Sequence, residues 1–158
     1  MYYEKLSFSE EITYISNLMW EKESRRMSWS EAIEYSKNLR LGNYEDWRLA
    51  TLEELLEMVT LFGGTPVTKN VNYQEVSSDN ICNKDYQFKY QKENFKPSYY
   101  WSSQCYDSAK LRVYDGSSAW CINFGNGSQS KYNKFSNLYV RCVRINKPFS
   151  SVKELLND

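Results

Sequence analysis

The sequence predicts an α+β domain in which two helices pack on one side of a mostly antiparallel, twisted sheet. Two capping motifs in the first half of the chain are each followed by apolar residues at helical spacing. The second half has short segments that alternate apolar and polar residues, which is typical of strands. A Gly-Asn-Gly turn signal separates two of those segments. A chain of 158 residues has the usual length of one domain.

The first half of the chain supplies one predicted strand and both helices. Ile12–Trp20 is rich in apolar and β-forming residues and is expected to be the first strand. Ser28-Trp29-Ser30-Glu31 has capping-box spacing, and the helix that it begins is expected to stop at Gly42. Thr51-Leu52-Glu53-Glu54 repeats the motif, and Gly63-Gly64 is expected to end this second helix. The stripe expected to be buried consists of Leu52, Leu55, Leu56 and Val59.

The second half of the chain is predicted to form the rest of the sheet. Residues 65–97 lack periodicity and are expected to be a long irregular region with a short helix or hairpin. A turn at Gly125-Asn126-Gly127 joins two strands. Pro148 is expected to end the domain, which leaves 1–147 as the folded unit and 148–158 as a tail with a possible short helix. The expected strands are Tyr99–Ser103, Ala119–Phe124, Gln129–Lys134 and Leu138–Ile145.

The charge balance narrows the classes of function. The chain has 20 acidic and 20 basic side chains and no His, which argues against a general nucleic-acid binder. The absence of His also excludes Ser-His and Cys-His nucleophile systems and His ligands for zinc. Residues 1–60 hold twelve acidic and seven basic groups, whereas 110–147 hold seven basic groups and one acid. This basic region could attract an anionic partner, or the two halves could neutralise each other in the fold.

The four cysteines and the N-terminus bear on the cellular compartment. The cysteines are far apart and form no Cys-x-x-Cys pair, and they allow three disulfide pairings among which the sequence does not choose. No apolar run follows Met1–Lys5, so no signal peptide is predicted, and no segment is long enough to insert in a membrane. We expect a cytoplasmic or phage-borne location, or surface exposure as part of a longer protein.

Five segments of this chain, in order from about residue 12 to 145, resemble a known family. The family is a bacterial one, typified by the C-terminal domain of a collagen-like adhesin. The matching segments are Asn17-Leu18-Met19-Trp20, Ser28-Trp29-Ser30-Glu31-Ala32-Ile33, Asp46-Trp47-Arg48-Leu49-Ala50-Thr51 with Glu54-Leu55, Tyr100-Trp101-Ser102-Ser103, and Val140-Arg141-Cys142-Val143-Arg144.

The resemblance implies a C-type-lectin-like fold in which the shared motif residues stabilise the scaffold. Arg48 is expected to bind a carboxylate or loop carbonyls, and Arg141 and Arg144 are expected to bind main-chain oxygens or acids such as Asp46 or Glu54. The chain departs from the family at Ala50, where relatives usually have Pro, and at Ser36, where many relatives have a cysteine that would pair with Cys142. The residues given a structural role are Trp20, Trp47, Arg48, Glu54, Trp101, Trp120, Arg141 and Arg144.

The resemblance also implies that ligands meet the C-terminal half. Residues 99–139 contain six Tyr, four Asn and eight Ser, a composition that suits a binding surface, although a polar outer sheet face would also explain it. We expect a non-catalytic binding module for a glycan or a protein. The basic residues suit an anionic glycan, and the adhesin relative implies glycosaminoglycan binding. The expected contact residues are Tyr106, Arg112, Tyr114, Asn123, Asn126, Ser128, Lys131, Tyr132 and Lys134.

Three other interpretations compete with this one. Calcium-dependent sugar binding is disfavoured because the lectin motifs Glu-Pro-Asn and Trp-Asn-Asp are absent, so no metal or cofactor is expected. Formylglycine-generating oxidases share the lectin-like fold, and Cys121 and Cys142 are predicted on adjacent strands, but the chain resembles the adhesin-type family more closely. A structural or assembly subunit of a phage or cell surface is the third, with oligomers forming through the tail at 148–158.

Overall fold

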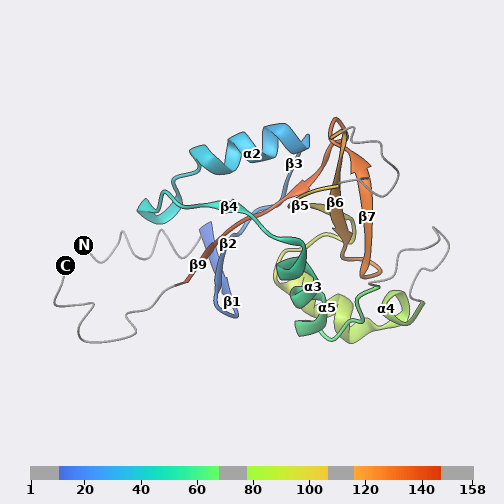
Figure 1. Ribbon diagram of the computed structural model, residues 1–158. Helices are drawn as coiled ribbons and strands as arrows, with labels where there is room; N and C mark the ends of the chain where they lie inside the picture. Colours follow the sequence, from blue (N-terminus) through green and yellow to red (C-terminus); the bar gives the residue numbers. More distant parts are fainter. Residues whose placement is uncertain (1–10, 68–77, 107–115, 147–158) are drawn as a thin grey trace, which may run out of the picture.

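The computed structural model describes residues 11–67, 78–106 and 116–146 and contains two sheets (Figure 1). The first has the strand order β1-β2-β9-β4 and the second the order β3-β8-β5-β6-β7. The strands are β1 (Ile12–Ile15), β2 (Leu18–Glu21), β3 (Arg25–Met27), β4 (Arg48–Leu49), β5 (Tyr99–Cys105), β6 (Ser118–Asn123), β7 (Ser128–Asn133), β8 (Leu138–Val140) and β9 (Cys142–Ile145). The helices are α2 (Trp29–Asn38), α3 (Leu52–Leu61), α4 (Ser78–Cys82) and α5 (Lys84–Lys92), with a short 3₁₀ helix η1 (Leu41–Asn43).

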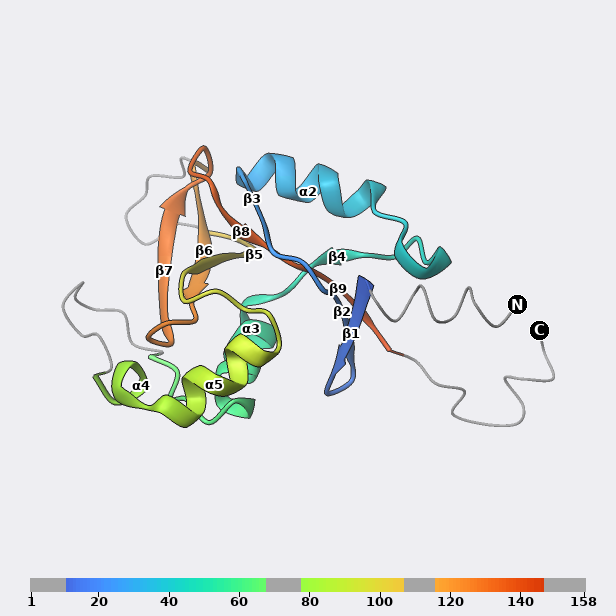
Figure 2. The same cartoon turned by 180° about the vertical axis from the view of Figure 1, so that it is seen from behind.

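The two predicted helices lie on opposite sides of the sheets, not on one side. Figures 1 and 2 show α2 above the strands and α3 and α5 below them. On β6, Ala119 and Cys121 are buried in the same apolar cluster as Ala32 of α2, whereas Ile122 is buried with Leu55 of α3. Both faces of β6 are therefore apolar, so both need a covering layer. The α+β class is confirmed, and the one-sided arrangement is wrong.

The predicted first strand is a hairpin of two strands. Ile12 pairs with Glu21 and Ile15 pairs with Leu18, so only Ser16 and Asn17 remain for the turn. Ser16 has a φ of 58°, the left-handed region that tight hairpin turns need. The sequence did not indicate this turn, because the segment is mostly apolar and the turn contains neither Gly nor Pro.

The predicted last strand, Leu138–Ile145, is also divided. Its first part, β8, pairs with β3 and β5 in the five-stranded sheet, and its second part, β9, pairs with β2 and β4 in the other sheet. Arg141 stands between the two parts and belongs to neither strand. This one segment therefore connects the two sheets.

Both predicted helix starts are confirmed. Ser28 caps α2 by accepting a hydrogen bond from the Glu31 N–H, and α2 ends at Asn38, four residues before Gly42. Thr51 and Glu54 form a complete capping box at α3, in which each side chain accepts a hydrogen bond from the other residue's N–H. The buried face of α3 contains Met58 in addition to Leu52, Leu55 and Val59, while Leu56 is partly buried.

The segment predicted as irregular contains two helices, α4 and α5, where one short helix or hairpin was expected. Asn83 caps α5 by accepting a hydrogen bond from the Tyr86 N–H. Tyr86 and Tyr90 bury their rings in the core, followed by Phe95 after the helix. Polar residues surround these aromatics, so hydrophobic periodicity did not reveal the helix. In the described part of the chain, no helix has both the length and the apolar composition needed to cross a membrane.

Arg141 joins three parts of the fold in the interior. Its Nε donates to the main-chain oxygen of Glu21 (2.6 Å), and its Nη1 donates to that of Glu93 (2.5 Å). The guanidinium lies over the ring of Phe95, 4.3 Å from its centroid. Burial lowers the pKa of Arg141 to about 10, which still leaves the side chain charged at neutral pH. The residue therefore holds β2 and the end of α5 against the junction of β8 and β9.

The carboxyl group of Glu21 completes this junction. It accepts hydrogen bonds from the Cys142 N–H (2.9 Å) and from the Tyr35 hydroxyl of α2 (2.6 Å). Burial raises the pKa of Glu21 above its ordinary value, and the hydrogen bonds from Tyr35 and Cys142 act in the opposite direction. Through its main chain and its side chain, Glu21 thus links β2 to Arg141, to β9 and to α2.

We expect Arg141→Met to lower the free energy of unfolding by about 3 kcal/mol, because it removes a buried cation that binds two carbonyls and leaves those acceptors without donors. Urea denaturation measures the change. The matched control is Arg26→Met at an exposed site on β3, where a change of roughly 0.5 kcal/mol is expected. An equal decrease in the free energy of unfolding in the two variants would contradict the central role of Arg141.

The pair of Arg48 and Glu54 predicts a dependence of stability on pH. Arg48 donates two hydrogen bonds to the Glu54 carboxylate (2.7 and 2.8 Å). Partial burial raises the pKa of Glu54, but the hydrogen bonds from Arg48 and Thr51 outweigh it and hold the pKa below its usual value. A lowered pKa in the folded state means that the stabilisation is present above the unfolded pKa of about 4.3 and disappears as the pH falls.

Glu54→Gln should therefore cost about 1 kcal/mol at pH 7 and much less at pH 3. Thermal unfolding of both proteins across this range measures the difference. Glu53→Gln changes an exposed glutamate in the same helical turn and should cost little at either pH. A Glu54→Gln cost that stays constant from pH 7 to pH 3 would show that the charge of Glu54 contributes nothing.

Candidate binding site

The candidate site lies around β7, at one edge of the five-stranded sheet. All six residues of β7 pair with β6, from Ser118↔Asn133 to Asn123↔Ser128. At its first residue β7 also meets Val67 through an isolated bridge. Residues that face each other across β6 and β7 project on the same side of the sheet, so this register assigns each predicted contact residue to a face.

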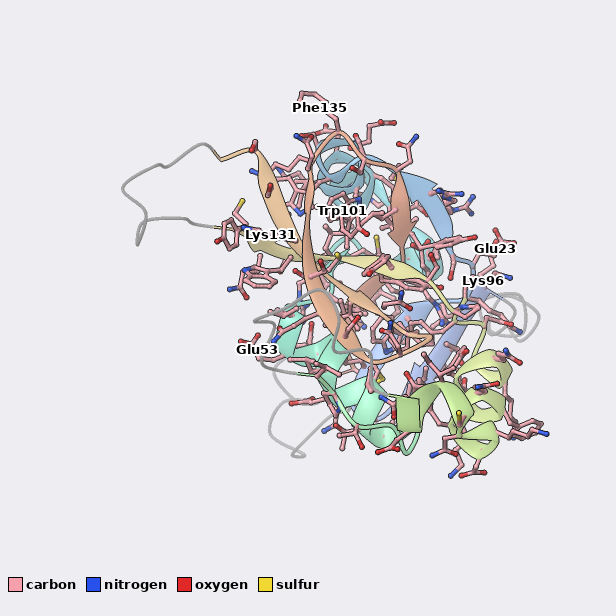
Figure 3. All side chains as sticks on the ribbon, turned by 90° about the vertical axis from the view of Figure 1, so that its right-hand side faces the viewer. Glu23, Glu53, Lys96, Trp101, Lys131 and Phe135 are labelled. Atoms are coloured by element: carbon pink, nitrogen blue, oxygen red, sulfur yellow. The ribbon has the colours of Figure 1, made fainter. Side chains whose placement is uncertain are left out.

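Tyr106, Trp120 and Lys131 form one cluster, called here the aromatic–lysine cluster. Trp120 and Lys131 are cross-strand partners, and the Tyr106 ring packs edge-on against Trp120 with 5.4 Å between centroids. The Lys131 ammonium lies 3.9 Å from the centroid of the Tyr106 ring. Lys131 is exposed and both aromatic residues are partly exposed (Figure 3, where Lys131 is labelled). The cluster thus presents a cation and two aromatic rings on one surface.

Tyr132 and Lys134 belong to the other side of the sheet. Tyr132 is the cross-strand partner of Ala119, and its ring meets that of Tyr99 with 4.9 Å between centroids. The Lys134 ammonium lies 4.5 Å from the centroid of the Trp29 ring at the start of α2. Trp29 itself donates its indole N–H to the main-chain oxygen of Ser102. This second aromatic and basic group is separated from the aromatic–lysine cluster by the sheet.

Asn123, Asn126 and Ser128 use their side chains to form the turn between β6 and β7. The Asn123 Oδ1 accepts a hydrogen bond from the Gly125 N–H (2.8 Å). The Asn126 Oδ1 accepts hydrogen bonds from the N–H (2.9 Å) and the hydroxyl (2.6 Å) of Ser128. These oxygens shape the loop, so they are less available to a ligand than the sequence suggested.

The same turn is fixed from behind by the buried side chain of Asn80. Its amide nitrogen donates to the main-chain oxygens of Thr65 (2.6 Å) and Asn126 (3.0 Å). Gly127 has a φ of 73°, and a Cβ there would lie 2.6 Å from the Asn80 amide nitrogen. The short helix α4 therefore positions one end of β7.

The nine predicted contact residues divide into several groups. Tyr106 and Lys131 come together on one face, Tyr132 and Lys134 lie on the other, and three residues form the turn. Arg112 and Tyr114 lie outside the described residues. Sequence reasoning gave Trp120 a structural role and left out Tyr99 and Trp29. The alternation of side chains along two paired strands, applied to β6 and β7, would have placed Trp120 beside Lys131. The contacts of Tyr99 and Trp29 depend on the tertiary fold.

The structure shows the surroundings of the other residues predicted to be structural. Trp20, Trp47 and Trp101 are buried, and the last two donate their indole N–H groups to the main-chain oxygens of Leu41 and Met27. Arg48 binds Glu54, as described above. Arg144 binds the carboxylate of Asp46 through two nitrogens, at 2.6 and 3.2 Å.

The four cysteines are free thiols, and two of them were candidates for oxidase chemistry. Cys82 and Cys105 are exposed, whereas Cys121 and Cys142 are buried. The prediction that Cys121 and Cys142 lie on adjacent strands is wrong, because β6 and β9 belong to different sheets. Burial raises the pKa of both thiols, which opposes formation of the reactive thiolate. Ser36 is buried in α2 and donates to the Ile33 main-chain oxygen.

Acidic residues near the candidate site do not suggest a metal centre. Among the residues that the structure describes, no three His, Cys, Asp or Glu side chains gather as metal ligands. The arrangement around β7 instead offers a cation, partly exposed aromatic rings and hydroxyl groups. These groups can contact a ligand.

Comparisons with known proteins agree with this architecture. The chain is similar to botrocetin, with a TM-score of 0.51 over 85% of this chain and 96% of that structure, at 10% sequence identity. It is similar to human lithostathine, with a TM-score of 0.50 over 87% of this chain and 90% of that structure, again at 10% identity. No curated protein sequence matches the chain.

At such low identity, the likeness to botrocetin and lithostathine concerns the fold alone. A family model gives the more specific relationship. Residues 14–144 match the family described as the Lcl C-terminal domain, and this range covers nearly all of both sheets and the candidate site. The fold is C-type-lectin-like, and the chain belongs to the Lcl C-terminal domain family.

Proposed function

We propose that this domain is a non-catalytic binding module and that its aromatic–lysine cluster binds an anionic glycan. The observation that carries the proposal is the contact of the Lys131 ammonium with the Tyr106 ring, 3.9 Å from its centroid, beside the partly exposed Trp120. Membership of the family supports a binding role. The basic composition of 110–147, which includes Arg112 close by in sequence, supports an anionic ligand.

The chemistry of the cluster suits a sulfated or carboxylated sugar. An ammonium group attracts sulfate or carboxylate, and aromatic rings offer flat apolar surfaces to the C–H faces of a sugar ring. The cation is already close to the aromatic system, so the two contacts fall within the span of one sugar residue. No calcium ion is required in this mode of binding, which agrees with the acid-poor sequence around β6 and β7.

Lys131→Ala should weaken binding to a sulfated glycan by about fivefold, which corresponds to roughly 1 kcal/mol. Tyr106→Ala should weaken it at least as much, because it removes both a ring and the support of the lysine. The measurement is the equilibrium affinity for immobilised sulfated and neutral glycans, with and without calcium, at two salt concentrations. Binding should be independent of calcium and weaker at high salt.

The matched control is Lys37→Ala, which removes an exposed lysine from the last turn of α2 and so gives the same change in net charge. Its affinity should equal that of the unchanged protein. Equal losses of glycan affinity in Lys37→Ala and Lys131→Ala would show that the net charge of the protein attracts the glycan and that Lys131 is not part of a specific site. Absence of binding to every glycan would overturn the glycan proposal and favour a protein ligand for this face.

A further inference from the structure

A concave region lies away from β7, between the end of β2 and the segment that follows α5. It is a cleft of about 470 Å³, within the usual range for small-molecule sites. One wall is the connection from β2 to β3, which includes Lys22 and Ser24, and the other is the connection from α5 to β5, which includes Asn94 and Lys96. In Figure 3, Lys96 and Glu23 lie on the opposite side of the view from Lys131.

Arg141 does not line the cleft itself, but it binds the main chain next to both walls from the interior. Its two hydrogen bonds end on the main-chain oxygens of Glu21, which lines the cleft, and of Glu93, which precedes the cleft residue Asn94. Its third nitrogen, Nη2, is buried and has no hydrogen-bond partner among the described residues. Arg141 is only 2% exposed, so its charge acts from a region of low dielectric. A fixed positive charge thus lies behind the two walls.

The walls are tied together by a chain of polar groups. The Ser24 and Tyr100 hydroxyls are 2.6 Å apart, and the Tyr100 hydroxyl accepts a hydrogen bond from the Lys96 N–H (2.8 Å). The Ser24 hydroxyl also lies within hydrogen-bond distance of the Asn94 main-chain oxygen. These contacts fix the separation between the two connections, which a preformed site requires.

Two lysines of the cleft have no ion-pair partner within the described part of the chain, although the lining is balanced overall, with three glutamates and three cations. Glu23 is paired with Arg25 at 3.2 Å, and the Glu21 carboxyl is occupied by Tyr35 and Cys142. Among the described residues, Lys22 and Lys96 form no ion pair, whereas Arg25, the third cation of the lining, is paired. Lys22 and Lys96 are therefore the cations of the lining that are available to bind an anionic group directly.

We propose that this cleft is a binding site for a small carboxylate-bearing molecule of about the size of a sugar acid. Lys22 and Lys96 hold the carboxylate from the two walls, and the buried guanidinium of Arg141 adds its field from below. The remaining polar lining, at Ser24 and Asn94, suits the hydroxyl groups of such a molecule. This site is independent of the aromatic–lysine cluster and does not rest on the function proposed for it.

The test uses D-glucuronate as the probe and glucose as its neutral counterpart, at constant ionic strength and pH 7. Amide chemical shifts of the full chain are followed by NMR during each titration. Glucuronate should produce saturable shifts centred on Ser24, Asn94 and Lys96, and glucose should produce none. Shifts that grow linearly without saturation, or that centre on Tyr106 and Lys131, would overturn the proposal.

Substitutions of single lysines show which positive charge binds glucuronate. Lys96→Ala should raise the dissociation constant for glucuronate at least fivefold, and Lys22→Ala together with Lys96→Ala should abolish saturation. Lys92→Ala in the last turn of α5 removes an exposed lysine that does not line the cleft and should change nothing. Lys131→Ala should also leave these shifts intact, so failure here is distinguishable from failure of the glycan proposal. Unchanged glucuronate affinity in the double variant would overturn the assignment.

Discussion

The fold depends on the way in which Arg141 and Glu21 connect two sheets that share no strand. The chain passes from one sheet to the other between β8 and β9, and at that point its main chain leaves both ladders. The Arg141 guanidinium and the Glu21 carboxyl supply the hydrogen bonds that a ladder would otherwise make. A buried charge is costly unless its partners are well placed. Here those partners come from β2, β9, α2 and the end of α5, so all four must be in position together.

Away from this interior junction, β7 at the edge of the five-stranded sheet lies mostly outside the core. The apolar clusters on the two sides of β6 are closed by α2 and by α3 with α5. Beyond them, β7 contributes few buried side chains, and Ser130 is the one residue of the strand that is buried. Lys131 and Tyr132 can therefore face solvent on opposite sides without disturbing the core. Because the side chains of β7 are mostly outside the core, they can change without loss of packing, which is why we assign ligand contacts to this edge.

Much of the fold could be predicted from the sequence because its signals are local. Ser28 and Thr51 cap their helices through hydrogen bonds with residues only three positions along the chain, so both helix starts could be recognised from the sequence. The Gly125–Gly127 turn is equally local. The hairpin at Ser16, the break at Arg141 and the position of α2 opposite α3 are fixed by contacts between distant segments, which a single sequence does not display. The candidate site shows the same limit. Lys131 and Tyr106 were both expected from the sequence. The place of Trp120 beside Lys131 and that of Tyr132 on the other face follow from the register of β6 and β7.

The crowded surroundings of Gly127 have a consequence for how this domain can diverge. A side chain at this position would meet Asn80 and the main chain of Thr65, and its backbone angle would be strained as well. Selection should therefore hold the turn nearly constant while the outward positions of β7 drift. New ligand specificities could then arise by exchange of a few exposed side chains, with the geometry that presents them inherited unchanged.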